Sequence, residues 1–281
     1  MVTGDDFGLA PEVNHAIVRA HREGILTATS LMVTAPAADE AVALARETPT
    51  LDVGLHLVLV QGRPASPDAR ATGLATASGA FRESAIPAAI RYFFSPRLRR
   101  AVQREVRAQL ERFRATGLPL AHLDGHLNVH LHPLVQDVLA PLVPEFGIPA
   151  MRLTREAVLP NLRYDRRHVA RKTFEGLVLR LLSAMAERRF RAHGVVFADR
   201  TLGLHQTGAC DEPYVLHLLD TLPPGTSELY CHPALGQTPE MRRLMPGYRP
   251  SDELAALTSP RVRERLEARG VVLARWSDLR A

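Results

Sequence analysis

The sequence predicts an α/β fold on a mostly parallel sheet, because short β-prone runs alternate with helical stretches along its length. The chain has 281 residues, of which 46% are hydrophobic, so it can bury one large core. No internal repeat and no composition shift marks a boundary. We therefore expect one domain over 1–281, with helical excursions around 84–116 and 160–192. The alternation alone fits either a barrel or a doubly wound sheet.

The first half of the chain begins with a short strand that ends at two adjacent acids, Asp5 and Asp6. Pro11 stands where the first turn of a helix should begin. A run rich in Gly, Pro, Ser and Ala is long enough to be a functional loop. The expected elements are a helix over 11–23, a strand over 25–34, a helix over 38–47, a strand over 51–60 and the loop over 61–79.

The second half repeats the alternation and includes two arginine-rich helices. Pro133 marks the start of a helix that follows a histidine-rich segment. The expected helices are 95–116, one from Pro133, 166–192 and 213–222. The expected strands are 118–126 with its exit loop, 150–153, 195–197, 227–233 and 271–276.

Composition limits the class of protein. The net charge is +5, which by itself is weak evidence for an anionic partner, and we expect no nucleic-acid binding. Two cysteines, Cys210 and Cys231, predict no disulfide framework. The chain has no secretory signal pattern and no apolar run of the roughly 18 residues that a membrane span needs. We therefore expect a cytoplasmic protein.

Polar residues cluster where three predicted strands end. Asp5 and Asp6 close the first strand, and His56 lies between leucines in a later one. The third cluster spans 122–132 and contains His122, Asp124, His126, Asn128, His130 and His132. The carboxyl ends of parallel strands meet on one face of the sheet, so these distant side chains can converge there.

The third cluster alternates polar and apolar residues, which is typical of an extended chain. Its histidines are also four residues apart, so a helix fits the same spacing. Gly125 permits a bend and Pro133 starts a helix. We therefore favour a strand followed by a loop.

Imidazole and carboxylate groups together bind divalent metals such as zinc, iron or manganese. Three protein ligands and one open position make a hydrolytic site, because the bound water becomes acidic near neutral pH. One aspartate and two histidines would supply these ligands. The other member of the Asp5–Asp6 pair would then be free to accept a proton from that water. This division of roles explains why two acids stand side by side.

Two later histidines are further candidates. His232, in “YCHPA”, follows a predicted strand and is placed to protonate a leaving group. His205 lies on a glycine-flanked loop that can reach a substrate. Each candidate has a structural alternative: His56 as a core histidine, the acidic pair as a helix cap, His232 as a helix start. Cys231 suggests a thiol nucleophile, but cysteines at strand ends are usually buried and unreactive.

Taken together, the motifs resemble the YdjC-like carbohydrate deacetylases. They are “DDFGL” from Asp5, “TSLMV” from Thr29, “GLHLVL” from Gly54, “HLDGHLNVHLHP” from His122 and “CHPA” from Cys231. The resemblance implies a distorted (β/α) barrel and removal of the acetyl group from an N-acetylated amino sugar with the help of one divalent metal. Zinc suits the expected ligands by softness, whereas the family resemblance often implies magnesium.

Carried onto this sequence, the resemblance assigns a role to individual residues. It implies that Asp6, His56 and His126 bind the metal, that Asp5 is the general base and that His232 is the general acid. We also expect a set of polar residues to orient the site or contact the substrate: Asp124, Arg152, His130 and His205.

A narrower resemblance is to the branch of this family that is associated with hopanoid biosynthesis. It rests on “GILTATSLMVTAPAADEAVALAR” from Gly24, “VGLHLVLVQGRPASP” from Val53 and “ELYCHPA” from Glu228. Gly4 replaces the usual alanine, and “DGHLNVH” is closer to the general family. This branch implies an N-acetylglucosaminyl hopanoid lipid as substrate. Alternatives are a soluble chitooligosaccharide, a phosphoester, and a sugar-binding protein without turnover.

The helix expected over 166–192 carries an apolar stripe and several arginines. Such a stripe usually packs on the barrel, with the arginines in solvent, and this is the arrangement we expect. The alternative is that the helix lies on the inner face of the cytoplasmic membrane, which would make the protein peripheral. The sequence leaves a homodimer open. The stripe consists of Phe174, Leu177, Val178, Leu181, Leu182 and Met185.

Overall fold

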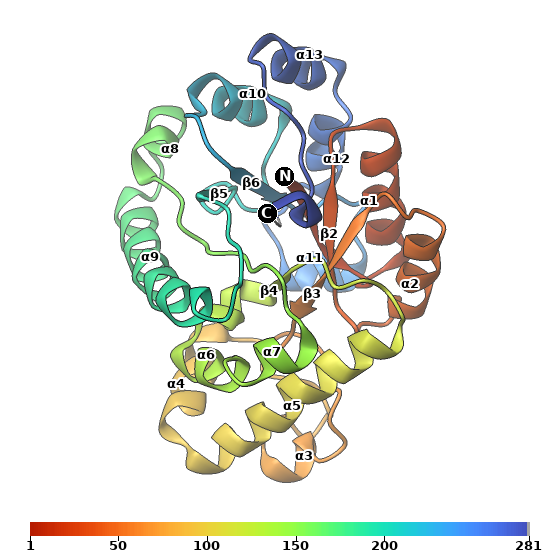
Figure 1. Ribbon diagram of the computed structural model, residues 1–281, viewed down its shortest axis with the longest axis vertical. Helices are drawn as coiled ribbons and strands as arrows, with labels where there is room; N and C mark the ends of the chain where they lie inside the picture. The colour runs from red at the N-terminus through yellow and green to blue at the C-terminus, as the bar shows by residue number, and fades with distance from the viewer. Residues whose placement is uncertain (280–281) are drawn as a thin grey trace.

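A parallel six-stranded sheet forms the centre of the molecule, and helices surround it (Figure 1). The computed structural model describes residues 1–279, apart from the side chains of Ala85, Ile86 and Phe93. The strand order is β4-β3-β2-β1-β6-β5, and every pairing is parallel. The strands are β1 (Val2–Phe7), β2 (Ala28–Leu31), β3 (Asp52–Leu57), β4 (Leu123–Gly125), β5 (Arg200–Leu202) and β6 (Ser227–Cys231).

The sheet curls into a half-barrel, which confirms the predicted distorted (β/α) barrel class. Beyond β4 the expected strands over 150–153 and 195–197 shrink to isolated bridges, Leu123 with Met151 and Ala150 with Val196. The first segment bridges β4 through Met151, and the second bridges the first through Val196 and Ala150, so the predicted strands are reduced to single bridges. The sequence also gave no signal for the three-residue β5.

Most of the expected helices form close to the predicted positions. The α-helices are α1 (Pro11–Glu23), α2 (Ala38–Arg46), α3 (Ala69–Thr72), α4 (Ala85–Phe94), α5 (Pro96–Ala115), α6 (Pro133–Leu139), α7 (Leu142–Phe146), α8 (Val158–Tyr164), α9 (Val169–Arg191), α10 (Glu212–Thr221), α11 (Pro239–Leu244), α12 (Pro250–Leu257) and α13 (Pro260–Ala268). Two 3₁₀ segments complete the set, η1 (His126–Leu131) and η2 (Trp276–Leu279).

The alternation predicted for 122–132 ends at Gly125. The chain leaves β4 there and enters η1, in which Leu127 and Asn128 have positive φ angles. The turn separates His126, at the end of the sheet, from His130, which is buried behind it. A strand followed by a tight turn therefore describes this segment better than a continuous period of two.

The C-terminal segment plugs one end of the half-barrel instead of forming the strand predicted over 271–276. Trp276 is fully buried and stacks on His122, with ring centroids 4.8 Å apart. Small residues at the amino ends of the strands, Ala28 and Ala121 among them, pack around Trp276. The N-terminus and the end of the described chain consequently lie near the centre of the view in Figure 1. Because this end is closed, the carboxyl ends of the strands are left for a functional site.

Gly54 in β3 makes room for the stacked histidine. A Cβ atom at this position would lie 2.4–2.6 Å from ring atoms of His122. Real carbon atoms do not approach so closely, and the ring is held between Trp276 and Ser30, whose Oγ lies 3.0 Å from His122 Nε2. The glycine is therefore required by packing.

We expect Gly54→Ala to lower the free energy of unfolding by about 1–3 kcal/mol, the usual cost of overpacking. Urea unfolding followed by circular dichroism measures this change. Gly247→Ala is the matched control, because nothing lies within 4 Å of a Cβ built on Gly247. Equal stability of the two variants would contradict the packing role of Gly54.

Candidate active site

A backbone irregularity at the end of β1 brings two adjacent acids into one interior. Neighbouring residues on a regular strand point to opposite faces. Here the register with β2 shifts between Gly4 and Phe7, and Asp6 adopts a φ of 64°. Asp5 and Asp6 are consequently both buried, with 3% and 2% of their surface exposed. The bulge explains how two adjacent acids can both serve one site, because each carboxylate contacts a different set of partners.

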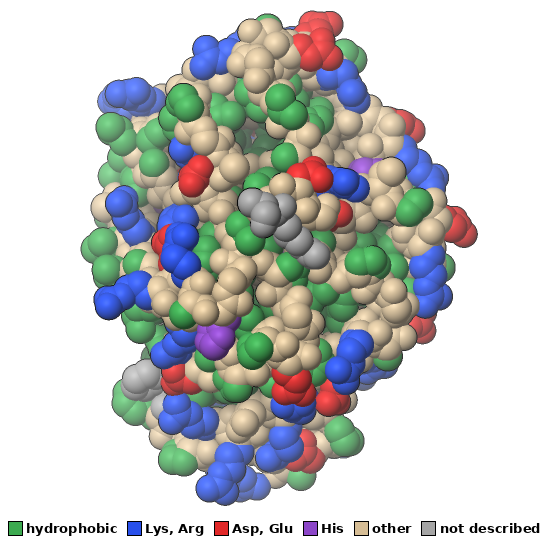
Figure 2. Space-filling model, viewed as in Figure 1, with side chains coloured by type: hydrophobic (Ala, Val, Ile, Leu, Met, Phe, Trp, Pro, Cys, Tyr) green, Lys and Arg blue, Asp and Glu red, His purple; other side chains and the backbone are tan. Residues whose placement is uncertain are grey.

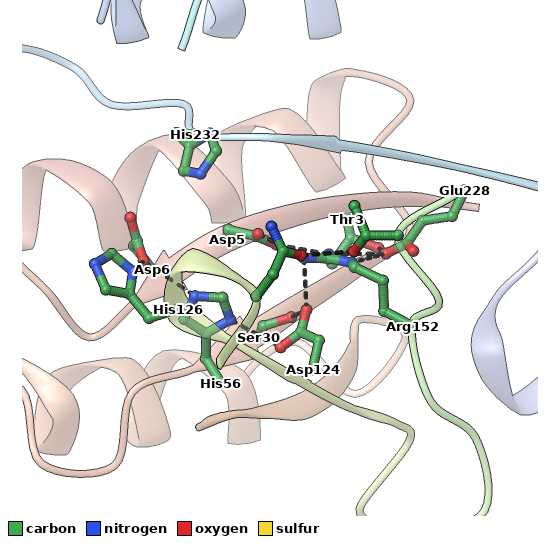
Figure 3. A network of polar contacts seen from close by, with 12 residues as sticks. Thr3, Asp5, Asp6, Ser30, His56, Asp124, His126, Arg152, Glu228 and His232 are labelled. Carbon is green, nitrogen blue, oxygen red and sulfur yellow. Dashed lines mark hydrogen bonds and ion pairs between the residues drawn. The ribbon is translucent and has the colours of Figure 1, made fainter. Parts of the chain in front are cut away.

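Asp6, His56 and His126 lie together at the carboxyl ends of β1, β3 and β4 (Figure 3). Asp6 Oδ1 lies 3.0 Å from His126 Nδ1 and 3.3 Å from His56 Nε2. One ligand atom from each residue falls within 4.8 Å of the others. The structure thus brings the three predicted ligands together.

A neighbouring acceptor orients each imidazole ring. His56 Nδ1 lies 2.8 Å from Asp124 Oδ1, and His126 Nε2 lies 3.2 Å from Gln61 Oε1. If these nitrogens carry the ring protons, the lone pairs of His56 Nε2 and His126 Nδ1 face Asp6. Carboxylate or carbonyl partners of this kind normally hold metal-binding histidines in place.

The residues fit a divalent cation on two further grounds. Asp6 Oδ2 is buried and has no hydrogen-bond partner among the described residues, and such an oxygen is costly unless it binds something. Close to Asp6, three more buried carboxylates add negative charge, and the guanidinium of Arg152 balances only part of it. They are Asp5, Asp124 and Glu228.

The pKa shifts agree with this excess of negative charge. Burial alone raises the pKa of Asp6, but His126 and His56 outweigh it and hold that pKa well below its usual range. Burial alone lowers the pKa of His56, whereas Asp124 and Asp6 raise it to about 10. In the metal-free protein His56 is therefore protonated near neutral pH, and a bound cation would replace that proton.

Arg152 forms ion pairs with three acids next to the candidate metal ligands. Its Nη1 and Nη2 atoms donate to the two oxygens of Asp5 at 2.7 and 2.8 Å. Arg152 also contacts Asp124 at 2.9 Å and Glu228 at 2.8 Å. This fork holds the Asp5 carboxylate in one orientation. Figure 3 shows Arg152 reaching from the far side of the network toward Asp5.

His232 faces the acids from the loop that follows β6 (Figure 3). Its backbone nitrogen donates to Glu253, and the ring of Tyr248 packs edge-on against its own at 5.1 Å. A cavity of ≈ 10 Å³ lies between Asp5, Asp6 and His232, which is room for about one water molecule. His232 Nδ1 is buried without a partner among the described residues.

Three of the expected substrate contacts are buried in this structure. Arg152 and His130 have 2% and 0% of their surface exposed, and both are engaged inside the protein, His130 through its Nε2 to the carbonyl of Arg152. His205 is buried against Gly176 of α9 and is not among the described residues that line the cavity at Asp5. Arg152 and His130 therefore hold other groups of the site in position, and a substrate contact by His205 stays a prediction.

Sequence reasoning missed several residues of the site. Gln61 lies in the loop after β3. Tyr248 and Glu253 come from the region of α11 and α12. Glu228 lies on β6, two residues before Tyr230. Gln61 and Glu228 stand inside motifs that the sequence analysis quoted, but no role was predicted for either. Tyr248 and Glu253 lie outside those motifs, and nothing local indicates their approach.

The fold and the site define an α/β half-barrel protein with an Asp–His–His cluster at the carboxyl ends of its strands. The chain belongs to the YdjC family, whose model, described as “YdjC-like protein”, matches residues 1–268.

Relatives and one solved structure resemble the chain over different lengths. A carbohydrate deacetylase of Brevibacillus brevis is 43% identical over 155 residues, 53% of this chain and 57% of that protein. A carbohydrate deacetylase of Geobacillus stearothermophilus is 30% identical over 99% of this chain and 96% of that protein. The crystal structure of a candidate cellobiose-phosphate cleavage protein from Enterococcus faecalis V583 superposes with a TM-score of 0.74 and 26% identity, covering 100% of this chain and 98% of the other.

Replacement of Arg152 by methionine tests the role of the buried fork. The change keeps the length of the side chain but leaves three carboxylates without their cation, so we expect the free energy of unfolding to fall by about 3–5 kcal/mol. Arg180→Met on the exposed face of α9 is the control and should change stability by less than about 0.5 kcal/mol. Chemical denaturation measures both, and a stable Arg152→Met protein would contradict the electrostatic role.

Proposed function

We propose that the protein is a metal-dependent deacetylase that hydrolyses the N-acetyl group of an amino sugar. The observation that carries the proposal is the cluster of Asp6, His56 and His126 beside a second acid, Asp5, with His232 facing both. The family and the relatives named carbohydrate deacetylase support the same chemistry. Asp6, His56 and His126 would hold the metal.

A divalent cation at these ligands would polarise the acetyl carbonyl and lower the pKa of a water molecule. Two histidines and one carboxylate suit zinc by softness, and magnesium is the alternative.

Asp5 is the residue we assign as general base. Both of its oxygens accept a hydrogen bond from the guanidinium of Arg152. These two bonds use two of the roughly four acceptor positions of a carboxylate. The remaining positions are available to a water in the cavity that Asp5 shares with Asp6 and His232. Arg152 thus fixes where the base points, while Asp5 removes the proton of the attacking water.

His232 is the residue we assign as general acid. It approaches from β6, on the side of the cavity away from His56 and His126 (Figure 3). Protonated at the imidazole, it would donate to the departing sugar amine. Tyr248 and the backbone contact with Glu253 hold the ring in position for that transfer.

A groove beside the site offers space for the rest of the substrate. Its volume is ≈ 190 Å³, and Leu9 lines both this groove and the small cavity at Asp5. Gln61, Met32 and Phe81 contribute a mixed polar and apolar lining. Charged side chains, Arg63 and Glu83 among them, also line the groove, and such a lining suits a sugar. For the whole substrate we propose an N-acetylglucosaminyl lipid of the hopanoid type, on the resemblance of the sequence to that branch. A soluble chitooligosaccharide is the alternative substrate.

Acetate release tests the proposed reaction. We expect the protein to release acetate from N-acetylglucosamine oligomers or from an N-acetylglucosaminyl lipid, to lose this activity after treatment with a chelator, and to regain it with zinc or magnesium. Mass spectrometry of both substrates, with and without chelator, measures the reaction and shows which substrate is preferred. Phosphate release from phosphorylated sugars without acetate release, or sugar binding without turnover, would contradict it.

Asp5→Asn separates the base from the metal ligands. We expect turnover to fall about 10²–10⁴-fold, the usual contribution of a general base, while metal stoichiometry stays at the wild-type value. Elemental analysis and acetate release measure the two properties on the same sample. Asp252→Asn, on the surface of α12, is the control. Wild-type turnover by a metal-loaded Asp5→Asn protein would refute the base assignment.

A further inference from the structure

The long helix α9 is oriented opposite to the predicted arrangement. Most of the apolar stripe expected to pack on the barrel faces outward instead, with Phe174 71%, Leu177 56% and Leu181 59% exposed, while Leu182 is half-buried against the core. The buried residues of the helix are Lys172, Gly176, Ser183, Ala186 and Phe190, of which all but Phe190 are small or polar.

Specific contacts explain why the small, polar side is inside. Lys172 Nζ donates to Asp165 at 3.0 Å, and Ser183 Oγ donates to the carbonyl of Thr154 at 3.2 Å. Gly176 lets the helix approach His205, since a Cβ there would lie 3.3 Å from the ring. The orientation of α9 is therefore fixed by its polar side, and the apolar side is left uncovered by the described residues. An exposed apolar patch of this kind usually marks an interaction surface.

Arginines extend the apolar line at both ends. Arg171, Phe174, Val178, Leu181, Met185 and Arg188 follow one another at spacings of three and four residues, so they share one face of the helix. Figure 2 shows hydrophobic and basic side chains interspersed along the flank where α9 lies in Figure 1.

Several arginines on and beside α9 have no acidic partner among the described residues. Within residues 1–279, no ion pair or hydrogen bond is recorded for the side chains of Arg163, Arg166, Arg180 or Arg188, all of them exposed. Arg171 is only loosely paired, 3.9 Å from Glu175. Unpaired cations beside an apolar stripe are complementary to a surface that is both anionic and apolar.

We propose that this face, α9 with the adjoining end of α8, docks onto an anionic lipid surface. The apolar side chains would enter the boundary between headgroups and acyl chains, and the arginines would contact lipid phosphates. Leu159 of α8, a helix that packs against α9, is a further exposed apolar side chain at 62%. No helix among the described residues has the length and hydropathy of a membrane span.

A second copy of this chain fits the same face less well. If two α9 helices paired along their apolar lines in antiparallel directions, Arg171 of each would meet Arg188 of the other. In parallel directions each arginine would meet its own equivalent. Like charges would oppose each other in both cases, which disfavours self-association.

The position of the face connects docking with the site. The helix α9 packs against η1, the segment that begins with the candidate metal ligand His126. For access to a lipid-linked sugar this inference rests on the proposed deacetylation; the docking itself does not depend on it.

Vesicle flotation of the full chain tests the docking without any substrate. The probes are vesicles of phosphatidylcholine and vesicles of an equal mixture of phosphatidylcholine and phosphatidylglycerol. We expect binding to the anionic vesicles only. Arg171→Gln with Arg188→Gln should lower partitioning roughly 25-fold, about fivefold per arginine. Phe174→Ser with Leu177→Ser and Leu181→Ser should lower it by more than about tenfold.

Matched controls change the same residue types elsewhere. Arg100→Gln with Arg112→Gln alters exposed arginines of α5, and Val272→Ser alters an apolar residue that is 85% exposed in the C-terminal segment. Both controls should bind as the wild type does. Acetate release from a soluble substrate should be unchanged in the α9 variants, so loss of that activity alone bears on the proposed reaction and leaves the docking untouched.

Two results would overturn the proposal. One is a wild-type protein that does not float with anionic vesicles, or α9 variants that float as well as it does. The other is a wild-type dimer, seen by light scattering, that the three serine substitutions convert to a monomer, since the face would then belong to a second copy.

Discussion

Negative charge buried at the centre of the half-barrel is the constraint on which the rest of the structure depends. Asp5, Asp6, Asp124 and Glu228 are all withdrawn from water, and Arg152 is the one guanidinium that joins three of them. Isolated buried carboxylates would be protonated or would destabilise the fold. Besides Arg152, protonated His56 supplies positive charge in the metal-free protein, and a bound cation would take the place of that proton beside Asp6, between His56 and His126.

The bulge at the end of β1 directs the two adjacent acids, Asp5 and Asp6, toward different partners. Asp6 turns toward the histidines, while Asp5 turns toward the fork of Arg152. Asp124 serves both sides, because it accepts from His56 and contacts Arg152. A change at one acid is therefore felt by its neighbours, and the proposed base and the proposed metal ligands share one electrostatic network.

The sequence predicts the parts of the site that depend on the ends of strands. Parallel strands align their carboxyl ends, so a site of one aspartate and two histidines could be expected from position, while the choice of Asp6, His56 and His126 came from the family resemblance. The pairing of Arg152 with Asp5 spans 147 residues, and the insertion of Trp276 beside Thr3 spans 273. Such contacts depend on how the sheet curls, which no local pattern specifies. The prediction that the apolar stripe of α9 packs on the barrel was wrong for a related reason. Periodicity identifies the two faces of a helix, but here Gly176 and Ser183 decide which face is buried.

The most direct test of the central claim is an anomalous difference map from a crystal soaked in zinc, recorded at the zinc absorption edge. The account predicts one strong peak at about 2.0–2.2 Å from Asp6 Oδ2, His56 Nε2 and His126 Nδ1. No peak at these atoms, or a zinc ion bound only elsewhere on the protein, would contradict it.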